Sequence, residues 1–208
     1  HSQLNIDPNR LLHQLALQKT QELSPQLRSL LQICCCLGER FEAELPAHAS
    51  GLSISEANAA ISHLVSLEII EYIDLVPAQS QINATTRQNR WLRFRHQDLQ
   101  HILIGEMSEQ AFNQTHLSIA KQLSNNRHQH DTYIYHIANH INQAKIADDQ
   151  RLWQLNANYT AAVQAQRENA MELALEYYQQ AYTASEFLYA TQPRSQRFHI
   201  IYNIADIY

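Results

Sequence analysis

Histidines and cysteines are the residues of this sequence best suited to chemistry. His136 and His140 stand four residues apart, a spacing at which one helix can chelate zinc. A zinc-protease helix needs a glutamate beside the first histidine, where this chain has Ile137. Both histidines lie off the apolar stripe, so we expect a solvated polar face and no metal site. His116 lies on an apolar stripe and is expected to be a core histidine.

The three cysteines are consecutive, Cys34 to Cys36. Successive helical residues point about 100° apart, so these thiols cannot converge on one metal ion. Cys34 and Cys35 fall on an apolar stripe and should be buried, whereas Cys36 is a redox candidate without a basic neighbour in sequence. Adjacent cysteines form no disulfide framework, which is typical of a cytoplasmic protein. No apolar run is long enough to span a bilayer.

No complete catalytic set is present, and three scattered glycines cannot form the phosphate-binding pattern GxxxxGK[ST]. We therefore expect no catalytic residues and no enzyme activity in this chain. The net charge of −5 argues against a dedicated nucleic-acid binder. The basic cluster Arg87, Arg90, Arg93 and Arg95 is expected to be solvated or to pair with an acidic surface of another domain.

Three helices are predicted in the first part of the chain. Ser24-Pro25 begins one helix, and Gly38 ends it in a left-handed conformation. A short helix follows over 44–50. Ser53 and Glu56 form a capping box, which begins the third helix.

Two strands follow these helices, at 69–76 and 91–95, as their β-branched residues and alternation indicate. Alternation places Leu92, Phe94 and His96 on one face. Three helices followed by a two-stranded hairpin predict a winged-helix-like domain over 24–107. Residues 1–23 are expected to be a linker with a helix beginning at Asp7-Pro8.

Residues 108–208 are expected to form an α-helical arm, truncated at its C-terminus, so the whole chain is mainly α. No glycine or proline occurs from Glu106 to Gln192, which favours long helices joined by polar turns. Helices are predicted to begin at Asp131, Asp148, Asn169 and after Pro193. Small residues over 158–181 alternate with tyrosines as in a tetratricopeptide-like (TPR-like) hairpin, although Asn158 stands near the place of the expected tryptophan. A generic helical pair is the alternative.

Several segments together resemble a family of large bacterial signalling proteins, the STAND-type AAA-like ATPases. Residues 30–41 are similar to the family's helix "LLxxAAxxGxxF", and residues 94–100 are similar to "FxHDxxQ", with Gln97 in place of aspartate. Residues His116–Ala120, Ile137–Ile141 and Leu152–Asn156 also look like family segments. The family's glycine before the wing is Glu68 here.

The resemblance implies a winged helix and helical arm that lie C-terminal to an ATPase core. ATP or ADP would be bound by that upstream domain, which would be a partner of this chain, and this chain would hold no cofactor. A histidine in a comparable place reaches the nucleotide phosphates, so His96, with Arg95, is the nucleotide-sensing candidate. The alternative is that His96 caps its helix or bonds a nearby carbonyl.

The resemblance therefore implies a regulatory and protein-interaction segment. A protein partner or small ligand would bind the arm's concave surface, where Tyr177, Tyr178 and Tyr182 would line either the groove or the core. The alternative function is a DNA-binding winged-helix transcriptional regulator. Its groove-facing helix would be residues 53–66, which contain no lysine or arginine.

Overall fold

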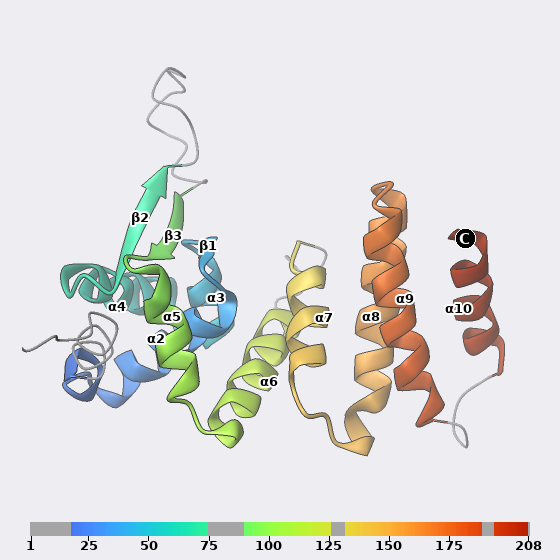
Figure 1. Ribbon diagram of the computed structural model, residues 1–208, viewed down its shortest axis with the longest axis horizontal. Helices are drawn as coiled ribbons and strands as arrows, with labels where there is room; N and C mark the ends of the chain where they lie inside the picture. The colour runs from blue at the N-terminus through green and yellow to red at the C-terminus, as the bar shows by residue number, and fades with distance from the viewer. Residues whose placement is uncertain (1–17, 75–89, 126–131, 189–193, 208) are drawn as a thin grey trace, which may run out of the picture. The chain divides into compact units, whose positions relative to one another are not determined.

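The computed structural model describes residues 18–74, 90–125, 132–188 and 194–207 (Figure 1). It is mainly helical, with one small antiparallel sheet, and it divides into two compact units, 1–115 and 116–208. The predicted boundary between 107 and 108 lies just before helix α6 (Glu109–Asn125), and the division between the two units falls within that helix. None of the described helices has the length and apolar character needed to cross a membrane.

The first unit alternates short helices with three strands. Its elements are α2 (Pro25–Leu37), β1 (Arg40–Glu42), α3 (Leu45–Ser50), α4 (Ile54–Ser66), β2 (Ile70–Asp74), β3 (Arg90–Phe94) and α5 (Gln97–Gly105). The predicted starts are confirmed: the Ser24 side chain accepts from the Leu27 amide, and Ser53 and Glu56 form the capping box. The helix expected to begin at Asp7-Pro8 lies outside the described residues.

The sheet has the strand order β1-β3-β2, so β3 is its central strand. The two predicted strands pair as expected, with Tyr72 opposite Leu92. The third strand, β1, was not predicted, because three residues are too few to show alternation. It places Phe41 opposite Leu92, and the Phe41 ring meets the Phe94 ring edge to face at 6.4 Å. These buried side chains hold β3 against the helices.

Gly38 ends α2, as predicted, but not in the left-handed helical conformation. Its φ of 113° and ψ of −174° lie in the mirror image of the extended region, which is open only to glycine. The amide of Gly38 reaches the Cys35 carbonyl at 3.4 Å. Gly38 thereby turns the chain out of α2 and directly into β1.

Both units contain a helix that ends in a left-handed residue other than glycine. Glu68 after α4 and Asn169 after α8 (Arg151–Arg167) each have a φ of 59°. In both cases the amide of the left-handed residue and the next amide donate to carbonyls of the last helical turns, as in a Schellman motif. Asparagine tolerates this conformation better than glutamate does. Glu68 therefore carries backbone strain, at the position where the resembling family has glycine.

We expect Glu68→Gly to raise the free energy of unfolding by about 1 kcal/mol, because glycine relieves the left-handed strain. Urea denaturation monitored by circular dichroism would measure this. Asn169→Gly should change stability much less. The control Glu68→Gln removes the exposed carboxylate but keeps Cβ, and it should leave the stability almost unchanged. A gain with Glu68→Gln equal to that with Glu68→Gly would contradict the strain explanation.

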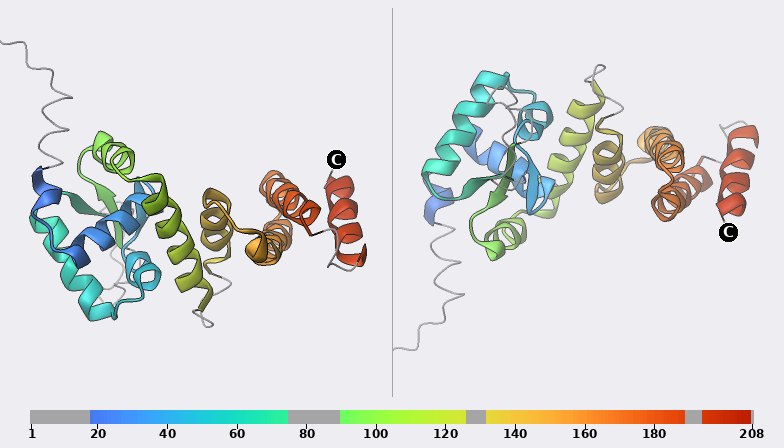
Figure 2. Two further views of the ribbon diagram at one scale, coloured as in Figure 1. Left: turned by 90° about the horizontal axis from the view of Figure 1, so that it is seen from below. Right: turned by 90° about the horizontal axis from the view of Figure 1, so that it is seen from above.

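The second unit is a row of helices that follow one another side by side (Figures 1 and 2). Helix α6 (Glu109–Asn125) begins in the first unit and ends in the second. The others are α7 (Ile134–Gln143), the 3-10 turn η2 (Asp148–Gln150), α8, α9 (Met171–Glu186) and α10 (Arg194–Ile207). Two predicted starts are therefore slightly early: Asp148 lies in η2 before α8, and Asn169 lies in the turn before α9. Helix α10 begins at Arg194, directly after Pro193, as predicted, whereas Asp131 lies outside the described residues.

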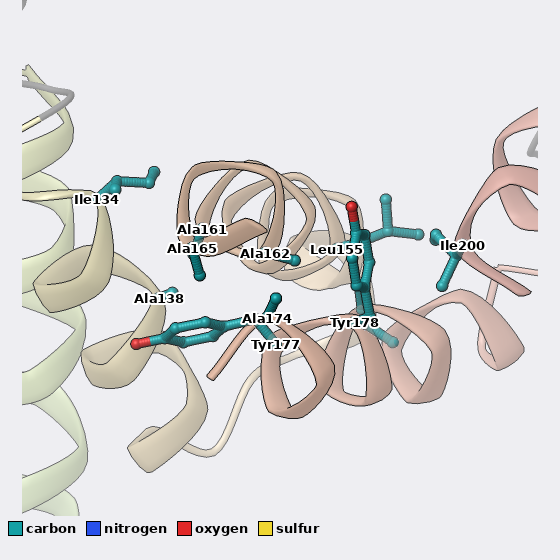
Figure 3. Close-up of a cluster of buried hydrophobic side chains, with 12 residues drawn as sticks. Ile134, Ala138, Leu155, Ala161, Ala162, Ala165, Ala174, Tyr177, Tyr178 and Ile200 are labelled. Atoms are coloured by element: carbon teal, nitrogen blue, oxygen red, sulfur yellow. The ribbon is translucent and has the colours of Figure 1, made fainter. Parts of the chain in front are cut away.

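Small side chains let α8 and α9 pack closely. Ala161, Ala162 and Ala165 of α8 are fully buried, as are Ala174 and Tyr178 of α9. Figure 3 shows the Tyr178 ring between these two helices, with Ile200 of α10 near it. Close approach of small residues to aromatic rings is the pairing predicted from the sequence.

Candidate functional site at the join of β3 and α5

Arg95 and His96 connect the central strand to α5, and buried groups on both sides position them. Phe94 lies in the core opposite Ile70, so β3 ends at a fixed place. The Arg95 amide donates to the Ile69 carbonyl at 3.1 Å, which holds the strand end against β2. Beyond this point the chain leaves the sheet, and both Arg95 and His96 are exposed.

A hollow of about 440 Å³ opens at this join. Its lining comes from the start of β1, the end of β3 and the first turn of α5: Glu39, Arg40, Arg93, Phe94, Arg95, His96 and Asp98. The two predicted candidates, Arg95 and His96, therefore lie together. Arg40 was missed, because it reaches the hollow only through the pairing of β1 with β3, where it faces Arg93.

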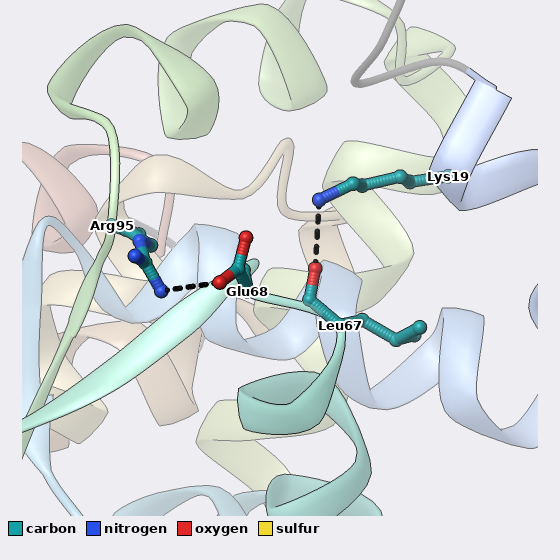
Figure 4. Close-up of polar contacts among 4 residues, drawn as sticks. All are labelled: Lys19, Leu67, Glu68 and Arg95. Carbon is teal, nitrogen blue, oxygen red and sulfur yellow. Dashed lines mark hydrogen bonds and ion pairs between the residues drawn. The ribbon is translucent and has the colours of Figure 1, made fainter.

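Two of the three arginines of the hollow have acidic partners. Arg93 pairs with Glu71 at 2.6 Å. Arg95 pairs with Glu68 at 3.0 Å, as Figure 4 shows. Both pairs are solvent-exposed, and such pairs contribute only about 0–1 kcal/mol, so an incoming anion can compete for these guanidinium groups. Arg40 makes no ion pair with any residue that the structure describes. Arg87 lies outside the described residues.

The imidazole of His96 does not cap α5. His96 is the N-cap residue by its extended backbone, φ −114° and ψ 126°, but its side chain makes no capping hydrogen bond. The alternative expectation that it caps the helix is therefore wrong. The free amides in the first turn of α5 and the helix dipole favour binding of an anion at this end of the helix. The carboxylate of Asp98, in the same turn, would repel that anion.

Gln100, in the segment that resembles "FxHDxxQ", has a structural role. Its amide nitrogen donates to the Cys35 carbonyl at 2.7 Å, and its side chain is buried. Cys35 lies near the end of α2, where carbonyl groups lack helical partners. Gln100 thus joins α5 to α2 and positions the helix that begins beside His96.

The cysteines have no features of a redox site. Cys34 and Cys35 are buried, as predicted, and Cys36 is half-buried. Burial raises the pKa of the Cys36 thiol to about 12, and that of Cys34 to about 12 as well. These thiols remain protonated at neutral pH, so the structure does not favour Cys36 as a redox sensor.

His140 corrects the prediction of a solvated histidine face on α7. It is only 5% exposed, and its Nδ1 lies 2.8 Å from Nδ1 of His116, which is 4% exposed. The His136 ring stacks on His140 with a centroid distance of 6.3 Å. His140 is buried because His116 of α6 packs against it, whereas His136 remains half-buried. Across the described ranges, no three histidine, cysteine or acidic side chains are arranged to hold a metal ion.

The tyrosines proposed for a partner groove lie mainly in the core. Tyr177 is 4% exposed and Tyr178 is fully buried, and Tyr182 packs against the same cluster. Their hydroxyl groups have internal partners: Tyr177 donates to Asn139 and Tyr178 donates to Gln166, each at 3.0 Å. Tyr177 and Tyr178 therefore do not line an open groove: the Tyr177 ring stacks on Tyr135 of α7, and the Tyr178 ring packs against Tyr159 of α8.

Comparison of this chain with protein-family models, with curated proteins and with solved structures finds no match.

Proposed function

We propose that this chain is a non-catalytic regulatory segment of a STAND-type signalling ATPase. In this proposal the first unit is a winged-helix-like domain that responds to the nucleotide of an upstream ATPase domain, and the second is a TPR-like arm that binds a partner. The element order of the first unit supports it, because three helices with a three-stranded sheet of order β1-β3-β2 suit a winged helix. The paired helices α8 and α9 are consistent with a TPR-like hairpin.

The hollow at the join of β3 and α5 is the observation that carries this proposal. It presents three guanidinium groups and the imidazole of His96, which has no hydrogen-bonding partner among the described residues. Guanidinium groups and a helix N-terminus are suited to phosphate oxygens. We therefore assign the hollow to the phosphate end of a nucleotide that the ATPase domain holds.

DNA binding by the first unit has little support from its surface. The exposed side of α4 carries Glu56, Asn58, Ser62 and His63. A helix that enters a DNA groove needs cationic or amide groups toward phosphates and bases, and here one carboxylate and one amide are present. We therefore propose that the first unit contacts another protein domain and not DNA.

In the full-length protein, we expect His96→Ala to accelerate ADP release by about tenfold, because one charge-assisted contact to phosphate is lost. Stopped-flow displacement of a fluorescent ADP analogue would measure the rate. Arg40→Gln should act in the same direction. The polypeptide that precedes His1 must contain a GxxxxGK[ST] segment for this experiment to apply, and the lack of one would itself overturn the proposal.

His101→Ala is the matched control, because His101 is an exposed histidine of the same helix that does not line the hollow. Its ADP release should equal that of the unchanged protein. Equal release rates for all variants would remove the nucleotide role from the hollow. Salt-sensitive binding of the chain to duplex DNA, lost in Arg40→Gln, would favour the DNA-binding alternative instead.

A further inference from the structure

A second hollow, of about 200 Å³, lies within the arm between the start of α7 and one face of α8. We call it the α7–α8 hollow. Its lining residues, Ile134, Tyr159, Thr160, Val163, Gln164 and Arg167, all belong to the second unit. Those from α8 recur at helical spacing, so they form one continuous strip along that helix.

The volume of the α7–α8 hollow indicates the size of its occupant. Sites for whole small molecules usually enclose roughly 300–1,000 Å³, which is more than is present here. One side chain of a partner can fill a small pocket while its backbone passes outside. Val163 and the Tyr159 ring, both half-buried, provide apolar contact, and the buried Ile134 lies behind them. The hollow therefore suits a single aliphatic side chain.

Two polar groups of the hollow remain available to a partner. The Arg167 guanidinium makes no ion pair, and the Tyr159 hydroxyl makes no hydrogen bond, within the part of the chain that the structure describes. The acid next in sequence, Glu168, is engaged elsewhere: it accepts from the Tyr135 hydroxyl at 2.7 Å and from the Gln164 amide at 2.6 Å. A carboxylate of a partner would complete both groups.

We infer that the α7–α8 hollow binds a partner peptide in which an aliphatic side chain is flanked by a carboxylate. The aliphatic side chain would pack on Val163 and the Tyr159 ring, and the carboxylate would pair with Arg167 and accept from the Tyr159 hydroxyl. This inference names the partner class of the arm and so rests on the proposed function. The hollow replaces the buried Tyr177 and Tyr178 as the docking surface.

Fluorescence anisotropy with three labelled peptide pools would test this on the whole chain. One pool has leucine between glutamates, one has leucine between lysines, and one has serine between glutamates. We expect saturable binding of the first pool only. Arg167→Gln should weaken it about fivefold, as for loss of one exposed ion pair, and Thr160→Trp should block it by filling the hollow. Thr160 suits this purpose because it is exposed.

Lys121→Gln is the matched control, since Lys121 is an exposed cation of the same unit outside the hollow. It should bind the first pool like the unchanged chain. Equal binding of the glutamate and lysine pools, or binding that neither Arg167→Gln nor Thr160→Trp alters, would overturn the inference. The assay contains no nucleotide, so its outcome is independent of whether His96→Ala changes ADP release.

Discussion

Lowering the pH from 7 to 5 is expected to destabilise the second unit by about 4 kcal/mol, because two buried histidines are neutral in its folded state. Burial lowers the pKa of His116 from 6.5 to about 4. Burial, followed by the neighbouring His116 and His136, lowers that of His140 to about 3. The unfolded chain takes up protons below pH 6.5, whereas the folded chain does not. Stability is therefore complete above pH 6.5 and falls by about 2 kcal/mol per histidine at pH 5.

The geometry of the pair supports the sign of this effect. The two Nδ1 atoms lie 2.8 Å apart, so one must carry a hydrogen and the other must accept it. Protonation of both rings would place two N–H groups head to head. The ring of His136, stacked on His140, would add a third positive charge at the same place. Acid therefore acts against the contact between α6 and α7.

Urea denaturation at pH 5, 6, 7 and 8 would measure the effect, with tryptophan fluorescence as the signal. Trp153 of α8 reports on the second unit, and Trp91→Phe removes the tryptophan of the first. The double variant His116→Gln/His140→Gln should lose most of the pH dependence between 5 and 7. The exposed His63→Gln should keep it. If the free energy of unfolding of the double variant fell with pH as steeply as that of the unchanged chain, other groups would be the cause of the acid sensitivity.

The histidine pair shows why part of this structure could not be predicted from sequence. Helical periodicity identifies one buried face, and in α7 that face holds Ile134, Ile137 and Ile141. His140 lies beside that face and is covered by His116 of α6. The residue pattern of α7 alone cannot predict this second contact. The bond from Gln100 to Cys35 likewise joins residues 65 positions apart. Polar residues of this kind are buried by another helix that is distant in the sequence, so the local sequence pattern does not predict their burial.

Features with a local cause were predictable. The capping box at Ser53 and Glu56 and the turn at Gly38 depend on residues within a few positions of each other. At the candidate site, the alternation of β3 placed Leu92, Phe94 and His96 on one face, of which Leu92 and Phe94 are buried and His96 is exposed. The strand-to-helix join located Arg95 and His96. Arg40 required the pairing of a three-residue strand, which has no sequence signal of its own.

Asn158 of α8 offers the other large expected effect, because this polar side chain is fully buried. Its amide group forms a reciprocal pair with Asn142 of α7, with nitrogen-to-oxygen distances of 2.7 and 2.8 Å. Its nitrogen also donates to the Gln154 carbonyl at 2.9 Å. We expect Asn158→Leu to lower the free energy of unfolding by about 3 kcal/mol, because it leaves the Asn142 amide without this partner and crowds a larger apolar group against it.

A double-mutant cycle with Asn142→Leu would separate the amide pair from simple packing. If the amide pair causes the loss of stability in Asn158→Leu, the double variant should regain about half of the lost free energy of unfolding, because neither amide is then left without its partner. Asn156→Leu, an exposed asparagine of the same helix, should change stability by less than about 0.5 kcal/mol. Additive losses in the double variant would mean that Asn158 acts through its shape alone. A coupling energy between the two substitutions would instead show that the amide pair carries the effect. Such a pair favours one register of α7 on α8, because a shift by one residue would separate the two amides and leave both buried without partners.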